Sequence, residues 1–366
     1  MTRNQAKSRL NRYAALASVA LIAVSLTAGV NGQVSRSDAV FSVNGRITIL
    51  AADGNRAAVA TRVKHGCGRI VVWTGPGKHS ISVKPGILGC AGDGVFQLAV
   101  GGGQVSWIEE GGGNDLEMSV MAAKLSGGAR KQLEFATNGD RAGGDPAGDW
   151  VGRLLGSGPL LAFNSWTQTC GKPTDQECGE HDPFLRLTNE KLVRIAAGRR
   201  LVVTRGVAAY PLLAVGGGRL AIGSIAGLTI RTANGAQVAT VPFAPSSARA
   251  VALSKTRLAI ETAGALDLYN LAPGAAVKSL PLGTAASLRL VDVGSRLALL
   301  QGPHRLLVVR LSDGKQISFP LRPGAAATLV GGRLTEAGLF YAYNTRTASR
   351  PSRIVFEPIG KLLARF

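Results

Sequence analysis

The chain has 366 residues, of which 46% are hydrophobic and 17% charged, and 42 basic against 22 acidic side chains give a formal net charge of +20. This composition excludes a generally disordered chain, and the length allows a sizeable core. Four cysteines are too few for disulfides to replace that core, and the 48 glycines follow no collagen period.

Residues 1–34 have the pattern of a secretory signal. Basic residues precede an apolar run from Ala14 to Val30, and small residues suited to cleavage follow. The run is shorter than the about 20 residues that comfortably span a bilayer, which favours a cleaved signal over an uncleaved membrane anchor. Both interpretations place the remaining chain outside the cytoplasm. Membrane contact is expected only through this segment, if it stays uncleaved.

The second half of the chain is periodic. An Arg-Leu pair recurs with spacings of 38, 39 and 37 residues, at Arg219, Arg257, Arg296 and Arg333. Prolines recur in the same phase at Pro242, Pro281 and Pro320, and turn dipeptides such as Asn-Gly and Asp-Gly form a third column. Such turns favour tight hairpins.

One repeat unit predicts four short strands. Apolar runs at 287–293, 296–300, 304–311 and 316–321 are separated by turn residues. No stretch keeps a helical period, so we expect few helices. The fourth run carries the recurring proline, which cannot donate a ladder hydrogen bond and is confined to edge strands. The fourth strand is therefore expected at the outer edge of a four-stranded antiparallel sheet.

Repeated four-stranded sheets of about 40 residues predict an all-β fold, a β-propeller, as one domain over residues 35–366. Second strands are expected to begin near Arg56, Gln104, Pro159, Arg219, Arg257, Arg296 and Arg333. This count favours seven blades, but an additional strand in 192–207 leaves six or eight open. The last blade is expected to take its third strand from 353–363 and its fourth from the N-terminal residues 40–43.

This layout resembles WD40-like and TolB-like bacterial β-propellers over nearly the whole mature chain. The Gly-His and Trp-Asp dipeptides of true WD40 blades are missing, and Val72-Trp73-Thr74 and Leu268-Tyr269-Asn270 are the nearest equivalents. The resemblance implies a binding or interaction module by analogy of fold.

Outside the cytoplasm the four cysteines are expected to pair, and three connectivities exist. In a propeller, loops between strands two and three share a face with loops between blades. Cys67 belongs to the first kind and Cys90 to the second, while Cys170 and Cys178 lie in one insertion. We therefore expect Cys67–Cys90 and Cys170–Cys178 as structural disulfides, with no redox or zinc role.

Five arginines are expected at the turn into a second strand, where they would form a basic arc on the opposite face: Arg56, Arg219, Arg257, Arg296 and Arg333. Residues 201–366 carry 19 basic and 6 acidic side chains, against 19 and 16 in residues 35–200. Such a field attracts anionic partners, and guanidinium groups match carboxylate or phosphate. The alternative is that these arginines serve hairpin geometry and solubility.

Signals for catalysis and cofactors are weak. The histidines have no metal-binding spacing, and neither a nucleophile elbow nor a phosphate-binding loop is present. The first strands read as too apolar to place a ring of polar ligands at a central channel. Acidic residues within 175–182 have oxygen ligands that suit Ca²⁺, but a solvated loop is the favoured explanation for them. Few aromatic residues and the expected compartment argue against nucleic-acid binding.

Two functions stay open. The favoured one is a non-enzymatic, extracytoplasmic module, without catalytic residues, metal or cofactor, that binds a protein or an anionic envelope polymer. The alternative is a propeller enzyme with its site in the cysteine-bearing loops of the first three blades. The sequence specifies neither the ligand nor the oligomeric state.

Overall fold

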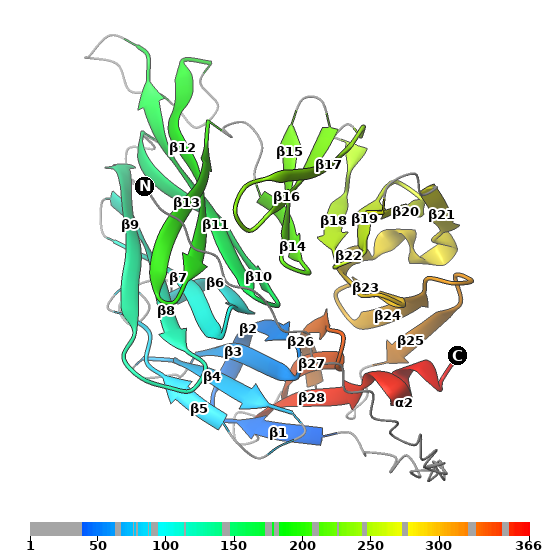
Figure 1. Cartoon of the computed structure of the whole chain (residues 1–366). Coiled ribbons are helices and arrows are strands. Elements are labelled where there is room, and N and C mark those ends of the chain that lie inside the picture. Colours follow the sequence, from blue (N-terminus) through cyan, green and yellow to red (C-terminus); the bar gives the residue numbers. More distant parts are fainter. Residues whose placement is uncertain are drawn as a thin grey trace, which may run out of the picture. The chain divides into compact units, whose positions relative to one another are not determined.

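Strands account for almost all of the regular structure, as the repeat predicts. Figure 1 shows the strands coloured in chain order, from β1 in blue to β28 in red. In this computed structural model the described residues are 39–366 without 63–66, 76, 78–79, 87, 89–93, 113–114, 141–146, 173–177, 179–182, 207–211, 225–226, 244–246, 273–276, 321–326 and 346–350. Arg36–Phe366 forms one unit, and the predicted N-terminal signal or anchor lies outside the described residues.

The described strands form five four-stranded sheets and one eight-stranded sheet, all antiparallel. The first sheet holds β2 (Arg46–Asp53), β3 (Arg56–Arg62), β4 (Arg69–Thr74) and β5 (Ser80–Val83). The eight-stranded sheet holds β6 (Gly94–Gly101), β7 (Gln104–Gly111), β8 (Asp115–Lys124), β9 (Lys131–Asp140), β10 (Gly148–Ser157), β11 (Leu160–Cys170), β12 (Leu185–Ala196) and β13 (Arg199–Arg205). A single residue pair, Gly148 with Asn138, joins β9 to β10, so this sheet consists of two groups of four strands.

Three further sheets repeat the same order of strands. They hold β14 (Leu212–Gly216), β15 (Arg219–Ser224), β16 (Gly227–Thr232) and β17 (Gln237–Val241); β18 (Ala250–Leu253), β19 (Arg257–Glu261), β20 (Ala265–Asn270) and β21 (Val277–Pro281); and β22 (Arg289–Val293), β23 (Leu297–Gln301), β24 (Arg305–Arg310) and β25 (Gln316–Pro320). A short 3₁₀ helix, η2 (Gly283–Ser287), precedes β22. Pro281 and Pro320 end the edge strands β21 and β25, as the proline column predicts.

The last sheet combines both ends of the described chain. It contains β26 (Ala327–Leu334), β27 (Gly338–Thr345) and β28 (Ser352–Pro358), and β1 (Ala39–Val43) pairs with β28. The N-terminal strand therefore lies at the edge of the C-terminal sheet, as expected. The predicted third strand at 353–363 is shorter than expected, because the chain turns after Pro358 into helix α2 (Ile359–Leu363).

The assignment of Arg333 to a second strand is wrong. Arg333 lies near the end of the first strand β26, opposite Phe340 of β27. The turn to the second strand follows it, where the N–H of Thr335 donates to the carbonyl of Gly338 at 2.9 Å. Gly338 has a φ of +155°, a conformation that favours glycine, so the second strand begins there. A repeated Arg-Leu pair therefore does not keep the same place in this sheet.

Each group of four strands is buried on both faces by its neighbours in the chain. Hydrophobic clusters lie between consecutive groups, and a further cluster joins the first and last groups, where the rings of Trp73 and Phe340 meet edge to face at 6.1 Å. Buried side chains therefore follow one another in several second strands without alternation. In β23, for example, Leu297–Leu300 are at most 1% exposed.

We expect Leu299→Ala to lower the free energy of unfolding by about 2–5 kcal/mol, because it opens a cavity between two sheets. Leu299 is fully buried beside Phe319 and Leu339. Urea unfolding followed by circular dichroism measures the change. The matched control is Leu201→Ala on the edge strand β13, where Leu201 is 44% exposed and the change should stay within about 0.5 kcal/mol. Equal losses in the two variants would contradict the packing described here.

Candidate functional site

The turns between first and second strands of the groups contact one another. The Oδ1 of Asp53 accepts from the N–H of Gly158 at 2.6 Å, and the carbonyl of Gly158 accepts from the N–H of Gly102 at 2.8 Å. The hydroxyl of Thr335 donates to the carbonyl of Gly54 at 2.7 Å. These contacts bring the turns before β3, β7, β11 and β27 together.

The turns that precede the other second strands also contact one another. Ser295 donates from its N–H and its hydroxyl to the carboxylate of Glu336, at 2.9 and 2.8 Å. Gly217 packs so closely on the backbone of Lys255 that a Cβ there would lie 2.2 Å from its Cα. Gly217 also has a φ of +56°, so glycine is required on both grounds. The surface made by these turns is called the turn face below.

Four of the five predicted arginines lie at the turn face. Arg56, Arg219 and Arg257 begin β3, β15 and β19, and Arg296 immediately precedes β23. Arg56 and Arg296 are exposed, whereas Arg219 and Arg257 are half-buried. We keep the name basic arc for these four residues. Within the described residues, no carboxylate forms an ion pair with Arg219, Arg257 or Arg296.

Arg333, the fifth predicted member, lies elsewhere. The first strands β2, β6, β10, β14, β18, β22 and β26 each contact the next one in this order, and β26 contacts β2. Residues from all of these strands line a central cavity of about 480 Å³. Its charged lining residues are Arg153, Arg249, Asp292 and Arg333. Three of the seven first strands thus contribute a charged residue to the cavity, although their sequences are largely apolar.

Breaks in strand alternation explain why the cavity residues were missed. The pairing of first with second strands shifts by a residue in β2, β6, β10, β14, β22 and β26. In β10 the shift falls between Val151 and Leu154, at Arg153, and in β22 it falls between Leu290 and Asp292. A bulge changes the face to which later side chains point, so a strict period of two misplaces them. The available signal was a charged residue within an apolar first strand.

Asp292 and Arg333 interact at one side of the cavity. The Nη1 of Arg333 lies 3.5 Å from the Oδ1 of Asp292, and its Nε donates to the carbonyl of Leu50 at 3.3 Å. The Oδ2 of Asp292 accepts from the N–H of Leu334 at 3.0 Å. Although 26% of the Asp292 side chain is accessible, it lies deep among the first strands. Burial raises the pKa of Asp292, while Arg333 and the N–H of Leu334 act in the opposite direction.

Arg153 lines the same cavity without a carboxylate partner among the described residues. Its Nη1 donates to the carbonyl of Leu213 at 3.3 Å, a contact with the next first strand, β14. Burial lowers the pKa of Arg153, and the positive charge of Arg333 lowers it further. The two guanidinium groups are therefore close enough to repel each other.

Arg249 is neutralised by a buried carboxylate. Glu261, which is fully buried, lies 3.5 Å from the Nε of Arg249 and 3.2 Å from the Nη1 of Arg289. Its Oε2 accepts from the N–H of Leu290 at 2.6 Å, which joins β19 to β22. Gln301 and Asn344, near the ends of β23 and β27, accept in the same way from the N–H groups of Gly332 and Ile47. Glu261 is thus one of several side chains that connect adjacent sheets.

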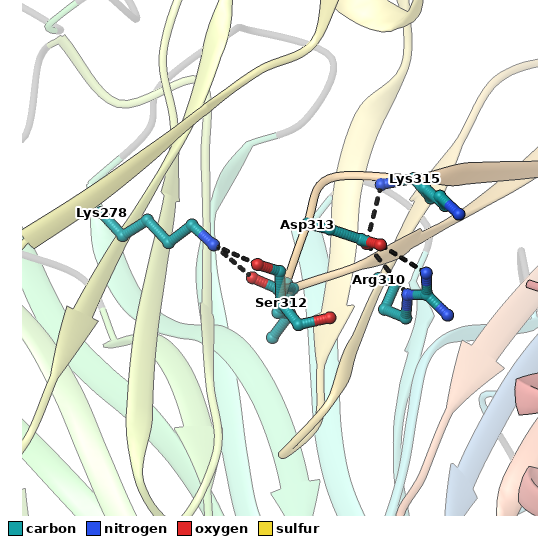
Figure 2. Close-up of polar contacts among 6 residues, drawn as sticks. Lys278, Arg310, Ser312, Asp313 and Lys315 are labelled. Carbon is teal, nitrogen blue, oxygen red and sulfur yellow. Dashed lines mark hydrogen bonds and ion pairs between the residues drawn. The ribbon is translucent and has the colours of Figure 1, made fainter.

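A second charged cluster lies at the turn between β24 and β25 (Figure 2). Arg310 donates to both carboxylate oxygens of Asp313 and holds the pKa of that carboxyl well below its usual range. The Oδ1 of Asp313 also accepts from the N–H of Lys315 at 3.2 Å. From β21, Lys278 donates to the carbonyl groups of Leu311 and Ser312, at 3.1 and 2.6 Å. Asp313 neutralises Arg310, and Lys278 is held by backbone carbonyl groups of the neighbouring sheet. We therefore interpret this cluster as a structural contact between two sheets.

The predicted Cys170–Cys178 disulfide is confirmed. The two Cα atoms lie 5.6 Å apart, and the bond bridges the connection between β11 and β12, where the insertion was expected. Cys67 is disulfide-bonded, while Cys90, its predicted partner, lies outside the described residues, so that pairing stays a prediction. The acidic residues of 175–182 and three of the histidines also lie outside them.

Among the described residues, no cluster of three or more His, Cys, Asp or Glu side chains is arranged to hold a metal ion. No helix in the same part of the chain has the length and apolar character needed to cross a membrane.

Solved structures with a similar fold include β-propellers. A prolyl endopeptidase aligns with a TM-score of 0.50 and 11% identity, over 88% of this chain and 47% of that one. PorZ, a surface component of the type IX secretion system of Porphyromonas gingivalis, aligns at 0.48 and 11% identity over 87% and 39%. The β-propeller domain of a Pyrococcus furiosus protease aligns at 0.39 and 9% identity over 86% and 96%. The chain thus spans less than half of the first two proteins.

The repeated four-stranded antiparallel sheets agree with the expected resemblance to WD40-like and TolB-like β-propellers. No protein-family model and no curated protein matches the sequence. Identities this low carry information about architecture only, so activity has to be argued from the residues of this chain.

We expect Asp292→Asn to leave the protein at least as stable as the wild type at neutral pH. The pKa of Asp292 is raised by folding, so its ionised form costs folding free energy above that pKa, and the cost disappears below the ordinary carboxyl pKa of about 3.9. Asparagine carries no charge and keeps an acceptor for Leu334. Any advantage of the variant should therefore shrink as the pH falls from neutral to about 4.

Urea unfolding of both proteins across this pH range measures the difference. A variant that is less stable than the wild type at neutral pH, and recovers in acid, would show instead that the ion pair with Arg333 outweighs burial.

Proposed function

We propose that the chain is a seven-bladed β-propeller that works outside the cytoplasm as a non-enzymatic binding module, and that its basic arc engages an anionic partner. Seven blades are supported by five four-stranded sheets together with the two groups of the eight-stranded sheet. The β1–β28 pairing, the contacts between successive first strands and the contact of β26 with β2 support a closed ring.

An extracytoplasmic location is supported by the Cys170–Cys178 disulfide, since such bonds persist in oxidising compartments. The basic and apolar pattern of residues 1–34 points the same way. The proposed partner is a protein or an envelope polymer that carries carboxylate or phosphate groups, and the proposal includes neither nucleic acid nor a cofactor.

The observation that carries the binding proposal is the set of arginines without acidic partners at the turn face. Arg219, Arg257 and Arg296 form no ion pair with a described carboxylate, whereas Arg310, at a turn between other strands, is fully paired with Asp313. Guanidinium groups that the chain does not neutralise can form charge-assisted hydrogen bonds with a partner. The net positive charge of residues 201–366 adds a field that steers anions to this region.

The alternative enzyme site in the cysteine-bearing loops receives no such support. Much of the first of these loops and most of the insertion between Cys170 and β12 lie outside the described residues. In the described part of the chain, no observation favours catalysis there.

We expect the double variant Arg257→Glu/Arg296→Glu to lose salt-sensitive retention on immobilised poly-L-glutamate. Loss of two charge-assisted contacts should weaken binding at least about tenfold. Affinity chromatography of the secreted protein over a salt series measures the effect, and the thermal unfolding midpoint verifies folding. The control Arg186→Glu/Arg205→Glu makes the same charge change on β12 and β13.

Retention by the arc variant equal to that of the wild type would contradict the proposal. Equal loss in both double variants would also contradict it, because net charge rather than the arc would then determine binding. The same pair of variants, applied to a cell-envelope fraction, identifies the natural partner as the component that only the control still retains.

A further inference from the structure

We propose that the central cavity binds a small dianion, with Arg153 and Arg333 as its guanidinium ligands. The cavity shares no residue with the basic arc, so this inference stands independently of the partner proposed for the turn face. The ligand class is a compact molecule with two negative charges on oxygen atoms, such as a dicarboxylate or a phosphate.

Charge balance in the cavity supports this ligand. Three of the lining residues are arginines, and Asp292 is the acidic residue among the lining side chains. The pair of Asp292 with Arg333 is long, at 3.5 Å, and the buried Glu261 is shared between Arg249 and Arg289. Arg153 has no carboxylate partner among the described residues. The protein therefore holds more positive than negative charge around the cavity.

The hydrogen bonds of Arg153 point to the same conclusion. A guanidinium has five N–H donors, and the structure provides Arg153 with a single acceptor, the carbonyl of Leu213. Arg153 lies in the β-bulge at residues 152–153 and lines the cavity. Its remaining donors match the paired oxygens of a carboxylate or phosphate.

Repulsion between Arg153 and Arg333 gives the site its selectivity. Both guanidinium groups line the cavity, and the charge of Arg333 disfavours the charge of Arg153. An anion between them removes this repulsion and gains attraction to both. A neutral molecule of the same shape provides neither effect, so charge rather than shape should govern binding.

The size and walls of the cavity restrict the ligand further. Its volume of about 480 Å³ suits a small molecule. Apart from the four charged side chains, the lining consists of alanine, valine, leucine and glycine from strands whose backbone groups are largely engaged in sheets. Such walls lack side-chain donors for a neutral polyhydroxyl compound. The arginines therefore provide the specific contacts.

Isothermal titration calorimetry of the full chain tests the proposal with succinate, inorganic phosphate and succinamide, the uncharged analogue of succinate. We expect one of the two dianions to bind, and the stronger one distinguishes a dicarboxylate from a phosphate ligand. Succinamide should produce no binding heat. Absence of binding for both dianions, or equal binding of succinamide, would overturn the proposal.

The variant Arg153→Gln should weaken binding of the dianion at least about tenfold while the protein stays folded, because Arg153 makes one neutral hydrogen bond. The matched control, Arg186→Gln on β12, lies outside both the cavity and the basic arc and should bind as the wild type does. If Arg153→Gln does not fold, Arg153→Lys retains the charge but loses the planar fork, and it should still bind more weakly. Wild-type affinity in the folded Arg153 variant would overturn the assignment.

The experiments distinguish the proposal for the basic arc from the proposal for the cavity. Arg257→Glu/Arg296→Glu should keep its affinity for the dianion, and Arg153→Gln should keep its retention on poly-L-glutamate. If the arc variant instead lost binding of the dianion and Arg153→Gln retained it, the anion site would belong to the turn face and the cavity assignment would be wrong.

Discussion

The structure depends on the inability of a small four-stranded sheet to bury its own faces. Strands of four to eight residues make up most of the sheets, and each sheet exposes two apolar faces unless neighbours cover both. Consecutive groups provide this cover along the chain, and the cluster around Trp73 and Phe340 provides it between the first and last groups. The second strands, covered on both sides, are therefore mostly buried, and the residues in the middle of most of them are apolar.

The same packing determines where charge remains without an acidic partner. Side chains near the ends of second strands accept hydrogen bonds from the next sheet, and Glu261 performs this role while it neutralises Arg249. At the β24–β25 turn, Arg310 is paired with Asp313, and Lys278 of β21 donates to backbone carbonyl groups of the neighbouring sheet, so these contacts serve the architecture. Arg153 in the cavity and three arginines of the basic arc, Arg219, Arg257 and Arg296, have no carboxylate partner among the described residues. We interpret this difference as the separation between structural and functional charge.

Much of the architecture could be predicted because it follows from local chemistry. Proline at the end of β21 and β25 marks an edge strand wherever it occurs, and two cysteines eight residues apart in one insertion can meet without knowledge of the remaining fold. The additional strand expected within 192–207 resolves as β13, the fourth strand of a group whose second and third strands are unusually long. Because β11 and β12 are longer than the other second and third strands, the four-strand order of this group was not recognised from the sequence.

The cavity could not be predicted, because its residues depend on bulges and not on period. Arg153 and Asp292 lie at or beside places where the pairing of the first strand shifts, and an alternating pattern assigns such residues to the wrong face. Arg333 was misplaced for a related reason, since β26 extends past the Arg-Leu pair before it turns. Its environment follows from a long-range contact with Asp292 and Leu50 that no spacing within the sequence reveals.

The central claim is that Arg153 and Arg333 bind an anion in the cavity, whereas Arg310, whose charge Asp313 neutralises, has a structural role. Nuclear magnetic resonance of arginine side chains labelled with ¹⁵N tests it directly, by following the Nε–H signals during titration with phosphate and with succinate. The account predicts that one of these anions shifts the signals of Arg153 and Arg333, while the signal of Arg310, paired with Asp313, stays in place. Equal shifts of all three signals, or a shift of Arg310 alone, would contradict it.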